Sequence, residues 1–217
     1  MASKGQAKPS LSDLSKRVIY DGNLRRFYEE LKSDNDRACA LVGTAGIDNA
    51  LTKALTAKFI PLSKEEEERL FNSTNAPLST LSGKILIAYA LGVIDNQDAK
   101  DLTTIRHVRN AFAHSSLEVA FADGGIVEKE CNTLSAFKRI NEVVGFYPKD
   151  IDCDTRDPRK LFTQSVWYFL IKIDMSTIRS LDAKNIMYIM RLFKLRCRLF
   201  LRIIIYNIKF VLSKFSF

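Results

Sequence analysis

The chain has 217 residues, 47% of them hydrophobic, which is enough for one globular domain with a sizeable core and an additional segment. Nine glycines and five prolines are too few for a sandwich or barrel built from many turns. The net charge of +8 is concentrated near the C-terminus, since residues 174–217 contain nine Lys and Arg against two Asp and Glu. The preceding residues are nearly neutral, so the basic balance is weak evidence for a nucleic-acid partner.

The cysteines and the N-terminus exclude several classes of protein. The cysteines form no C-x-x-C pair and have no histidine cluster beside them, which argues against a zinc site and a disulfide framework. We therefore predict no metal and no cofactor, and a cytoplasmic location. Residues 1–11 lack the apolar segment of a signal peptide and are predicted to be a disordered lead-in. The four cysteines are Cys39, Cys131, Cys153 and Cys197.

Apolar residues recur at helical spacing from residue 12 onward, and capping and breaking residues divide this pattern into helices. Ser33–Asp36 is a start signal, and Pro61 is expected to end the helix that follows it. In that helix Gly43 and Gly46 are small enough for another helix to approach closely. The five helices are expected over residues 12–32, 37–60, 63–71, 79–94 and about 98–113.

The fourth of these helices is apolar on most sides, so we expect it to be the central helix of a bundle. The periodicity changes after His114, where a D-G-G turn between two β-prone runs predicts a small β-hairpin. A short helix over 133–144 and a further helix from Asp157 are expected to follow. The predicted fold class is therefore all-α: a bundle of five to seven helices in a domain over 12–173, with this hairpin after the fifth helix.

The stretch Ile105–Ser116 contains both histidines and is the strongest candidate for a functional site. Within the second helix, Asp48 lies seven residues from Leu41 and from Leu55, so its carboxylate is expected on the core side, where it needs a partner. Arg109 lies at the edge of the apolar stripe of the fifth helix. We therefore predict a structural ion pair between Asp48 and Arg109 that ties the two helices together.

Residues 174–217 form a basic, apolar tail without about 18 consecutive uncharged apolar residues, so a transmembrane helix is not expected. A basic amphipathic helix of this kind could lie on a membrane surface or bind in the groove of a partner. Packing on the bundle or on a second copy, a poorly selected tail and an altered reading frame are equally open. We assign the tail no function.

Several separated motifs resemble the mannitol operon repressor (MltR-like) family over about residues 25–172. The resemblance implies an all-helical bacterial regulator that represses genes for mannitol uptake and use. Because no helix-turn-helix is found here, it would act through a protein partner or a homo-oligomer, without binding operator DNA directly. The motifs are Asp36–Ala40, Asp48–Leu51, Pro77–Ile85, Ala88–Gly92, Ile105-Arg106 and Arg109–His114.

A more distant resemblance links R-N-A-F-A-H to the Arg–His motif of HEPN domains, some of which are metal-independent RNases or toxins. In this alternative, Arg109 would stabilise phosphate charge, His114 would act as acid or base, and Asn110 would complete the catalytic set. RNA is a partner only in this alternative. An arginine held by Asp48 would not be free for phosphate, so we predict no catalytic residues and place the regulator first.

Overall fold

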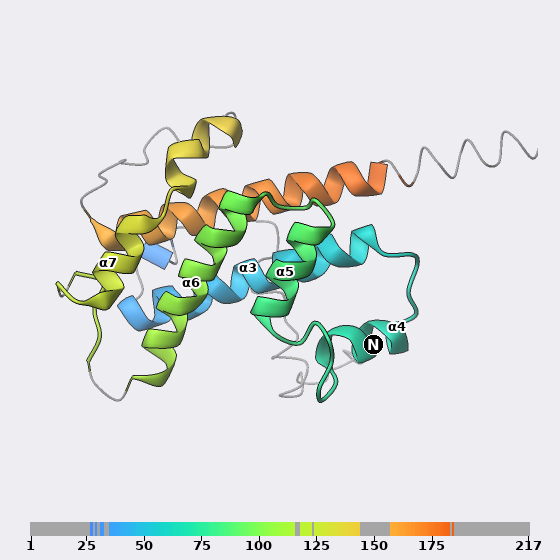
Figure 1. Cartoon of the computed structure of the whole chain (residues 1–217), viewed down its shortest axis with the longest axis horizontal. Coiled ribbons are helices and arrows are strands. Elements are labelled where there is room, and N and C mark those ends of the chain that lie inside the picture. Colours follow the sequence, from blue (N-terminus) through green and yellow to red (C-terminus); the bar gives the residue numbers. More distant parts are fainter. Residues whose placement is uncertain are drawn as a thin grey trace, which may run out of the picture. The chain divides into compact units, whose positions relative to one another are not determined.

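The computed structural model describes residues 27, 29, 31–32, 35–115, 118–122, 124–143, 157–182 and 184. This part of the chain is mostly helical and contains no strand, which confirms the predicted all-α class (Figure 1). The chain divides into two compact units, Met1–Ser176 and Thr177–Phe217, and the labelled helices all belong to the first unit. Predictions for residues 1–26, 144–156 and 185–217 lie outside the described residues, including most of the first helix and the tail.

Helix α3 (Asp36–Lys58) begins where its start signal predicts. The side chain of Asn35 accepts a hydrogen bond from the backbone N–H of Ala38 at 2.8 Å, which satisfies one of the free donors of the first turn. The helix ends three residues before Pro61, in agreement with the expected stop. Its buried side chains include Cys39, Ile47, Leu51 and Leu55, so the predicted apolar stripe is the face that enters the core.

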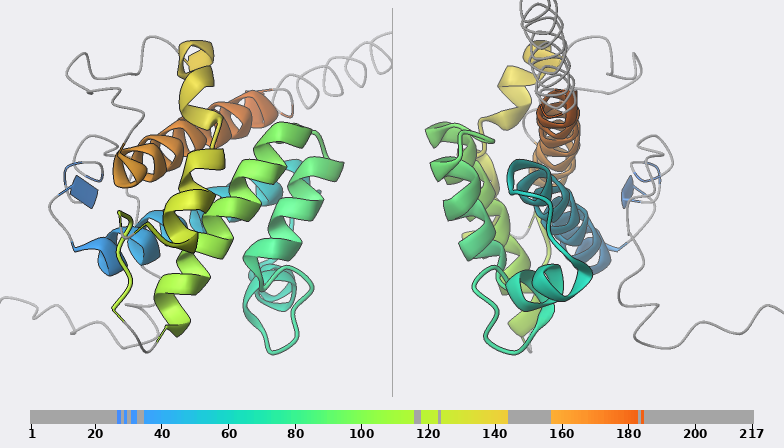
Figure 2. Two further views of the ribbon diagram at one scale, coloured as in Figure 1. Left: turned by 60° about the vertical axis from the view of Figure 1, so that its left-hand side comes forward. Right: turned by 90° about the vertical axis from the view of Figure 1, so that its right-hand side faces the viewer.

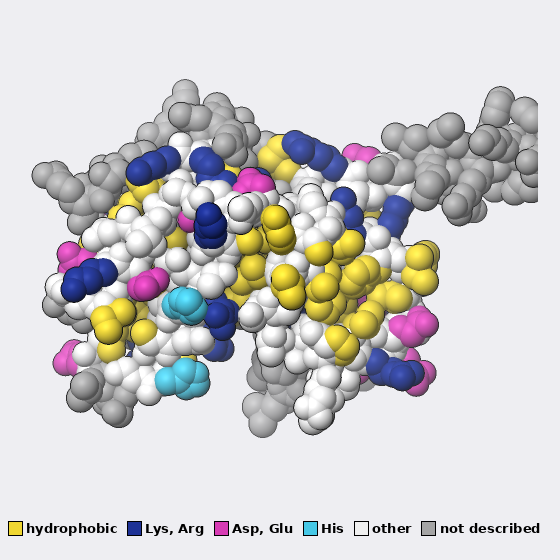
Figure 3. Space-filling view, viewed as in Figure 1, with side chains coloured by type: hydrophobic (Ala, Val, Ile, Leu, Met, Phe, Trp, Pro, Cys, Tyr) yellow, Lys and Arg dark blue, Asp and Glu magenta, His cyan; other side chains and the backbone are white. Residues whose placement is uncertain are grey.

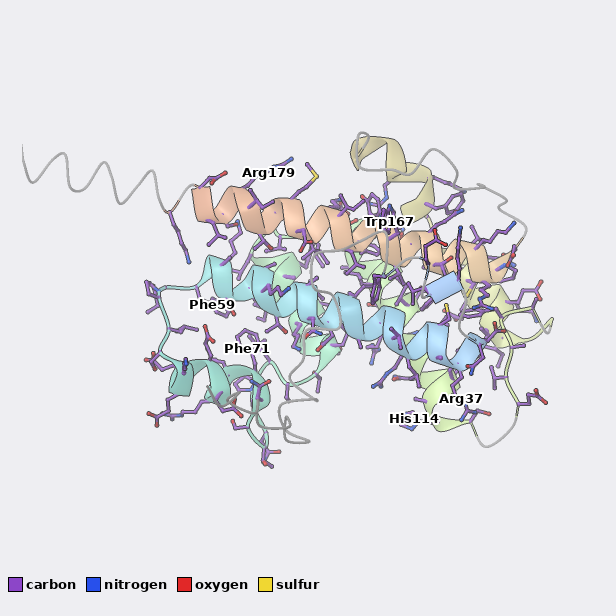
Figure 4. The ribbon with its side chains drawn as sticks, turned by 180° about the vertical axis from the view of Figure 1, so that it is seen from behind. Arg37, Phe59, Phe71, His114, Trp167 and Arg179 are labelled. Carbon is purple, nitrogen blue, oxygen red and sulfur yellow. The ribbon has the colours of Figure 1, made fainter. Side chains whose placement is uncertain are left out.

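A short acidic helix follows, as predicted. In α4 (Lys64–Glu67), the side chain of Ser63 and that of Glu66 bond reciprocally to each other's backbone N–H in a capping box. One π-helical turn, η1 (Glu68–Asn72), continues it and buries Phe71. The Phe71 ring lies 6.3 Å from that of Phe59, between centroids, and joins this segment to the end of α3 (Figure 4).

Helices α5 (Leu81–Ala90) and α6 (Asn96–His114) lie side by side against α3 (Figures 1 and 2). The turn between them places Gly92 at a φ of 66°, a conformation in which a side chain would be strained. Asp95 then starts α6 with a second capping box. Both helices thus begin and end at local signals that the sequence contains.

The prediction that the fourth helix is central is wrong. In α5 the side chains of Lys84, Ile85 and Ala88 are buried, whereas Leu86 and Tyr89 on its outer face are 65% and 47% exposed. The most deeply buried helix is the one that starts at residue 158, since every residue over 161–171 is buried. High apolarity in a short helix therefore reflects an exposed apolar face here, and not a central position.

The helix over 158–176 packs closely on α3 through the small residues that the sequence singled out. A Cβ added at Gly43 would lie 3.3 Å from Val166 Cγ2 and 3.4 Å from Phe162 Cε1. A Cβ at Gly46 would lie 2.8 Å from the ring of Phe27, so a larger residue would displace that ring. The expected close approach is thus confirmed, at Gly43 by a helix and at Gly46 by a phenylalanine ring.

The predicted β-hairpin after the fifth helix is wrong for the residues that the structure describes. Its expected second strand is the helix α7 (Ile126–Thr133), which Gly125 precedes. Val127 and Cys131 are buried, and their spacing of four places both on one face of that helix. A 3-10 helix, η2 (Ala136–Val143), stands where the short helix over 133–144 was expected.

Candidate functional site

A cleft of about 600 Å³ opens where α3, the start of α5 and α6 meet. Figure 3 shows this face, on which the surface is hollowed between α6 and the segment that leads into α5, with Lys or Arg side chains on the α6 side. Three segments far apart in the sequence supply its walls, so only the fold creates it. The lining residues are Leu41, Thr44, Ala45 and Asp48 of α3, Ser79, Thr80, Leu81 and Ser82, and Arg106, Arg109 and Asn110 of α6.

The carboxylate of Asp48 is paired with the ammonium group of Lys84, not with Arg109 as predicted. Lys84 Nζ lies 2.6 Å from Asp48 Oδ2, and the two side chains are 6% and 35% exposed. Lys84 is the single charged residue of α5, and its buried position requires an acidic partner. Asp48 is the only carboxylate among the described residues of the cleft wall, and it sits at the rim instead of in the core.

Arg109 is exposed and donates a hydrogen bond from Nη1 to Asn110 Oδ1 at 3.0 Å. No ion pair joins Arg109 to an acidic side chain among the residues that the structure describes. Arg106, one helical turn earlier, also lines the cleft, and its Nη2 lies 2.9 Å from His107 Nε2. Since Asp48 is neutralised by Lys84, the two guanidinium groups leave this cleft with an excess of positive charge.

A buried hydroxyl completes the wall on the side of α3. Thr44 is 3% exposed, and its Oγ1 has no hydrogen-bond partner. A buried hydroxyl without a partner is uncommon, because it loses its bonds to water and gains none from the protein. The Nε of Arg106 is likewise buried without a partner. Both groups belong to residues that line the same cleft, so the cleft contains hydrogen-bonding capacity that the protein does not use internally.

The third wall is the N-terminus of α5. Thr80 caps the helix, since its Oγ1 accepts a hydrogen bond from the N–H of Gly83 at 3.1 Å. The N–H groups of Leu81 and Ser82 lie in the first turn and have no acceptor within the helix. A helix N-terminus carries a partial positive charge and favours anions. The start of α5 therefore adds to the positive character of the cleft.

The predicted trio of Arg109, Asn110 and His114 is only partly brought together. Arg109 and Asn110 line the cleft, whereas His114 is exposed in the last turn of α6 and does not line it. His114 lies near Arg37, whose Nη2 donates a hydrogen bond to the carbonyl of Ser115 at 3.1 Å (Figure 4). Because α6 remains helical through His114, Arg109 and His114 point about 140° apart around its axis.

Sequence reasoning missed a second polar cluster, which lies away from the cleft. Asp98 is fully buried in α6 and pairs with Arg139 at 2.7 Å and with Lys172 at 2.7 Å. Asp101 pairs with Arg139 at 3.1 Å and accepts a hydrogen bond from Ser135. The cluster therefore ties α6 to η2 and to the helix over 158–176, and every charge in it is matched by an opposite charge.

This cluster shifts several pKa values. Partial burial alone would raise the pKa of Asp95, but the backbone N–H of Asp98 and the ammonium of Lys172 outweigh it and lower the pKa to about 2. Burial raises the pKa of Tyr168 to about 12, and Lys172 opposes that rise. The guanidinium of Arg139 and the ammonium of Lys172 each lie within 5.4 Å of the centre of the Tyr168 ring. These shifts stabilise the charged network and indicate a structural role.

Cys39 and Cys131 are free and buried. Burial, together with the nearby charge of Glu130, raises the pKa of Cys131 to about 12, so its reactive thiolate form is strongly disfavoured. Cys153 and Cys197 lie outside the described residues. Within the part of the chain that is described, no group of three or more His, Cys, Asp or Glu is placed to hold a metal ion.

The signals that could have identified the missed cleft residues are modest. Arg106 precedes Arg109 and Asn110 by three and four residues, a spacing that places all three on one helical face. Lys84 stands alone as a charge in an apolar helix, which calls for a carboxylate nearby. Nothing in the local sequence marks Thr44 as lacking a hydrogen-bond partner, because that depends on which helices surround it.

Comparisons of the chain with protein-family models, with curated proteins and with solved structures found no significant match. None of the described helices has both the length and the apolarity that crossing a membrane requires. The chemistry of the cleft and of the exposed surfaces is therefore the basis for assigning a function.

Proposed function

We propose that this protein is a repressor-like regulator of a mannitol or related sugar-alcohol operon that acts in the bacterial cytoplasm through protein contacts. The observation that carries the proposal is the cleft itself, because segments on which the family resemblance rests converge there. Asp48 comes from one of these motifs, Ser79–Ser82 and Lys84 from another, and Arg109 and Asn110 from a third. A shared site is a reason for such motifs to occur together in one chain.

The exposed face of α5 supports action through a protein partner. Leu86, Tyr89 and Leu91 are 65%, 47% and 41% exposed, and hydrophobic side chains gather over this helix in Figure 3. Apolar side chains that form a contiguous patch on a protein surface commonly mark a contact with another protein. Direct recognition of operator DNA is not part of the proposal, because residues 1–173 are nearly neutral in charge.

The proposal is tested by measuring transcripts of the sugar-alcohol uptake operon in the bacterium that encodes the protein. Overproduction should lower those transcripts, and the double substitution Leu86→Glu/Tyr89→Glu should relieve the repression. Ile126→Glu is the matched control, since Ile126 is 77% exposed but lies on α7, and it should repress normally. Transcript levels that ignore overproduction, or tight binding of the isolated protein to operator DNA, would contradict the proposal.

A second candidate is a metal-independent RNase, and one observation favours it. Arg109 is not held by Asp48 and bonds only to the neutral amide of Asn110 among its described contacts, which leaves its charge available for a phosphate. Against this candidate, His114 does not line the cleft. Incubation with structured RNA tests it: cleavage should be lost in His114→Ala and retained in His107→Ala. Negligible cleavage by the unchanged protein would remove this candidate.

A further inference from the structure

We propose that the cleft between α3, α5 and α6 binds the phosphate group of a small hydroxylated molecule, such as a sugar phosphate or polyol phosphate. This inference follows from the charges and hydrogen-bonding groups of the cleft wall and does not depend on the regulatory role. It names a ligand class and a site, and it predicts which side chains contact each part of the ligand.

The positive side of the cleft fits a phosphate. Arg106 and Arg109 lie one helical turn apart on α6, and a guanidinium group can donate two parallel hydrogen bonds to one phosphate. The first-turn N–H groups of Leu81 and Ser82 at the start of α5 provide further donors, with the helix dipole oriented to favour an anion. The Asp48 carboxylate would repel an anion, but its charge is offset by Lys84 at 2.6 Å.

A second observation, independent of the helix N-terminus, indicates that the cleft is built to accept a ligand. Thr44 is 97% buried by its 3% exposed fraction, and its hydroxyl lines the cleft without a hydrogen-bond partner. The structure leaves this hydroxyl unsatisfied at a cost that a ligand oxygen would remove. A valine of nearly the same shape at this position would avoid that cost, so the hydroxyl is better explained by binding than by packing.

The remaining groups select a small hydroxylated body over a nucleotide. Hydroxyls from Ser79, Thr80 and Ser82, the amide of Asn110 and the free lone pairs of Asp48 can exchange hydrogen bonds with ligand hydroxyls. None of the described residues that line the cleft is aromatic, so the wall offers a nucleobase no ring on which to stack. The volume of about 600 Å³ lies within the range of sites for small molecules.

The test is isothermal titration calorimetry of the full chain with four probes: mannitol 1-phosphate, glucose 6-phosphate, unphosphorylated mannitol and inorganic phosphate. We expect at least one of the two phosphate esters to bind more tightly than inorganic phosphate, and mannitol not to bind measurably. Arg106→Ala and Arg109→Ala should each weaken binding of that ester about tenfold or more, since each removes charge-assisted hydrogen bonds. Arg109→Lys should give an intermediate loss, because it keeps the charge and removes the paired donors.

Arg69→Ala is the matched control, because Arg69 is an exposed arginine of η1 that does not line the cleft, and it should change binding less than twofold. Thr44→Val should weaken binding without lowering the melting temperature of the free protein, which separates lost contact from lost folding. The proposal is overturned if neither ester binds, if mannitol binds equally well, or if Arg69→Ala weakens binding as much as Arg109→Ala. Tighter binding of AMP or of a single-stranded RNA oligomer than of either ester would also overturn it. None of these outcomes bears on the transcript test of the regulator.

Discussion

Asp48 on α3 and Lys84 on α5 form an ion pair with Oδ2 and Nζ 2.6 Å apart, and this pair joins two helices at the wall of the cleft. The side chain of Lys84 is nearly inaccessible, whereas that of Asp48 is 35% exposed. The lysine is therefore the member that needs the pair more, because its charge has little access to water. The pair also sets the charge of the cleft, since it neutralises the carboxylate opposite Arg109.

Removal of the acidic partner is expected to destabilise the fold. Asp48→Asn leaves the Lys84 ammonium buried without an opposite charge and should lower the free energy of unfolding by about 2–4 kcal/mol. The double substitution Asp48→Asn/Lys84→Met should recover most of that loss, because it leaves no buried charge. Urea unfolding followed by circular dichroism measures both. Arg109→Ala is the control and should stay within about 0.5 kcal/mol. An equal loss in Arg109→Ala would restore the pairing that the sequence predicted.

The buried cluster around Asp98 should be the most sensitive polar site in the molecule. Asp98→Asn removes the carboxylate that faces both Arg139 and Lys172 and should cost about 3–5 kcal/mol, because it leaves buried cations without their partner. Asp95→Asn is a graded comparison, since Asp95 is 55% exposed and asparagine also caps a helix, so its cost should be about 1 kcal/mol. Similar costs for the two substitutions would show that burial does not govern this cluster.

Stability should fall in acid partly through Asp95. Its pKa is lowered from 3.8 to about 2, so the folded state holds the deprotonated form more strongly than the unfolded state does. The resulting stabilisation is complete above about pH 4 and is lost as the pH falls toward 2. Melting temperatures measured between pH 6 and pH 2 should therefore drop more for the unchanged protein than for Asp95→Asn. Parallel curves for the two proteins would contradict the assignment.

Thr44→Val should stabilise the free protein by about 1 kcal/mol, because it replaces a buried hydroxyl without a partner by a methyl group of similar size. Thr103→Val is the matched control on α6. Its Oγ1 donates to the carbonyl of Ala99 at 2.7 Å, so the same chemical change there removes a hydrogen bond and should be neutral or destabilising. Thermal unfolding measures both variants, and destabilisation by Thr44→Val would mean that its hydroxyl contributes to packing.

The helix boundaries were largely predictable from the sequence, whereas the candidate site was not. Asn35, Ser63 and Asp95 each cap a helix through a residue three positions further along, so the signal and its consequence lie within one turn. The error at α7 has the same local origin, because Ile126 and Val127 favour a strand by propensity. The burial of Val127 and Cys131 on one helical face outweighs that preference.

What the sequence by itself determined is the all-α class, the starts and stops of the helices, and the close approach at Gly43 and Gly46. These follow from interactions within a few residues or from the absence of a side chain. Only the tertiary structure decided that Lys84 and not Arg109 meets Asp48, that residues 161–171 form the buried helix, and that Thr44 and Arg106 share a cleft. Periodicity shows which face of a helix is apolar, but the partner of a polar group depends on how separate helices pack, and no local pattern encodes that geometry.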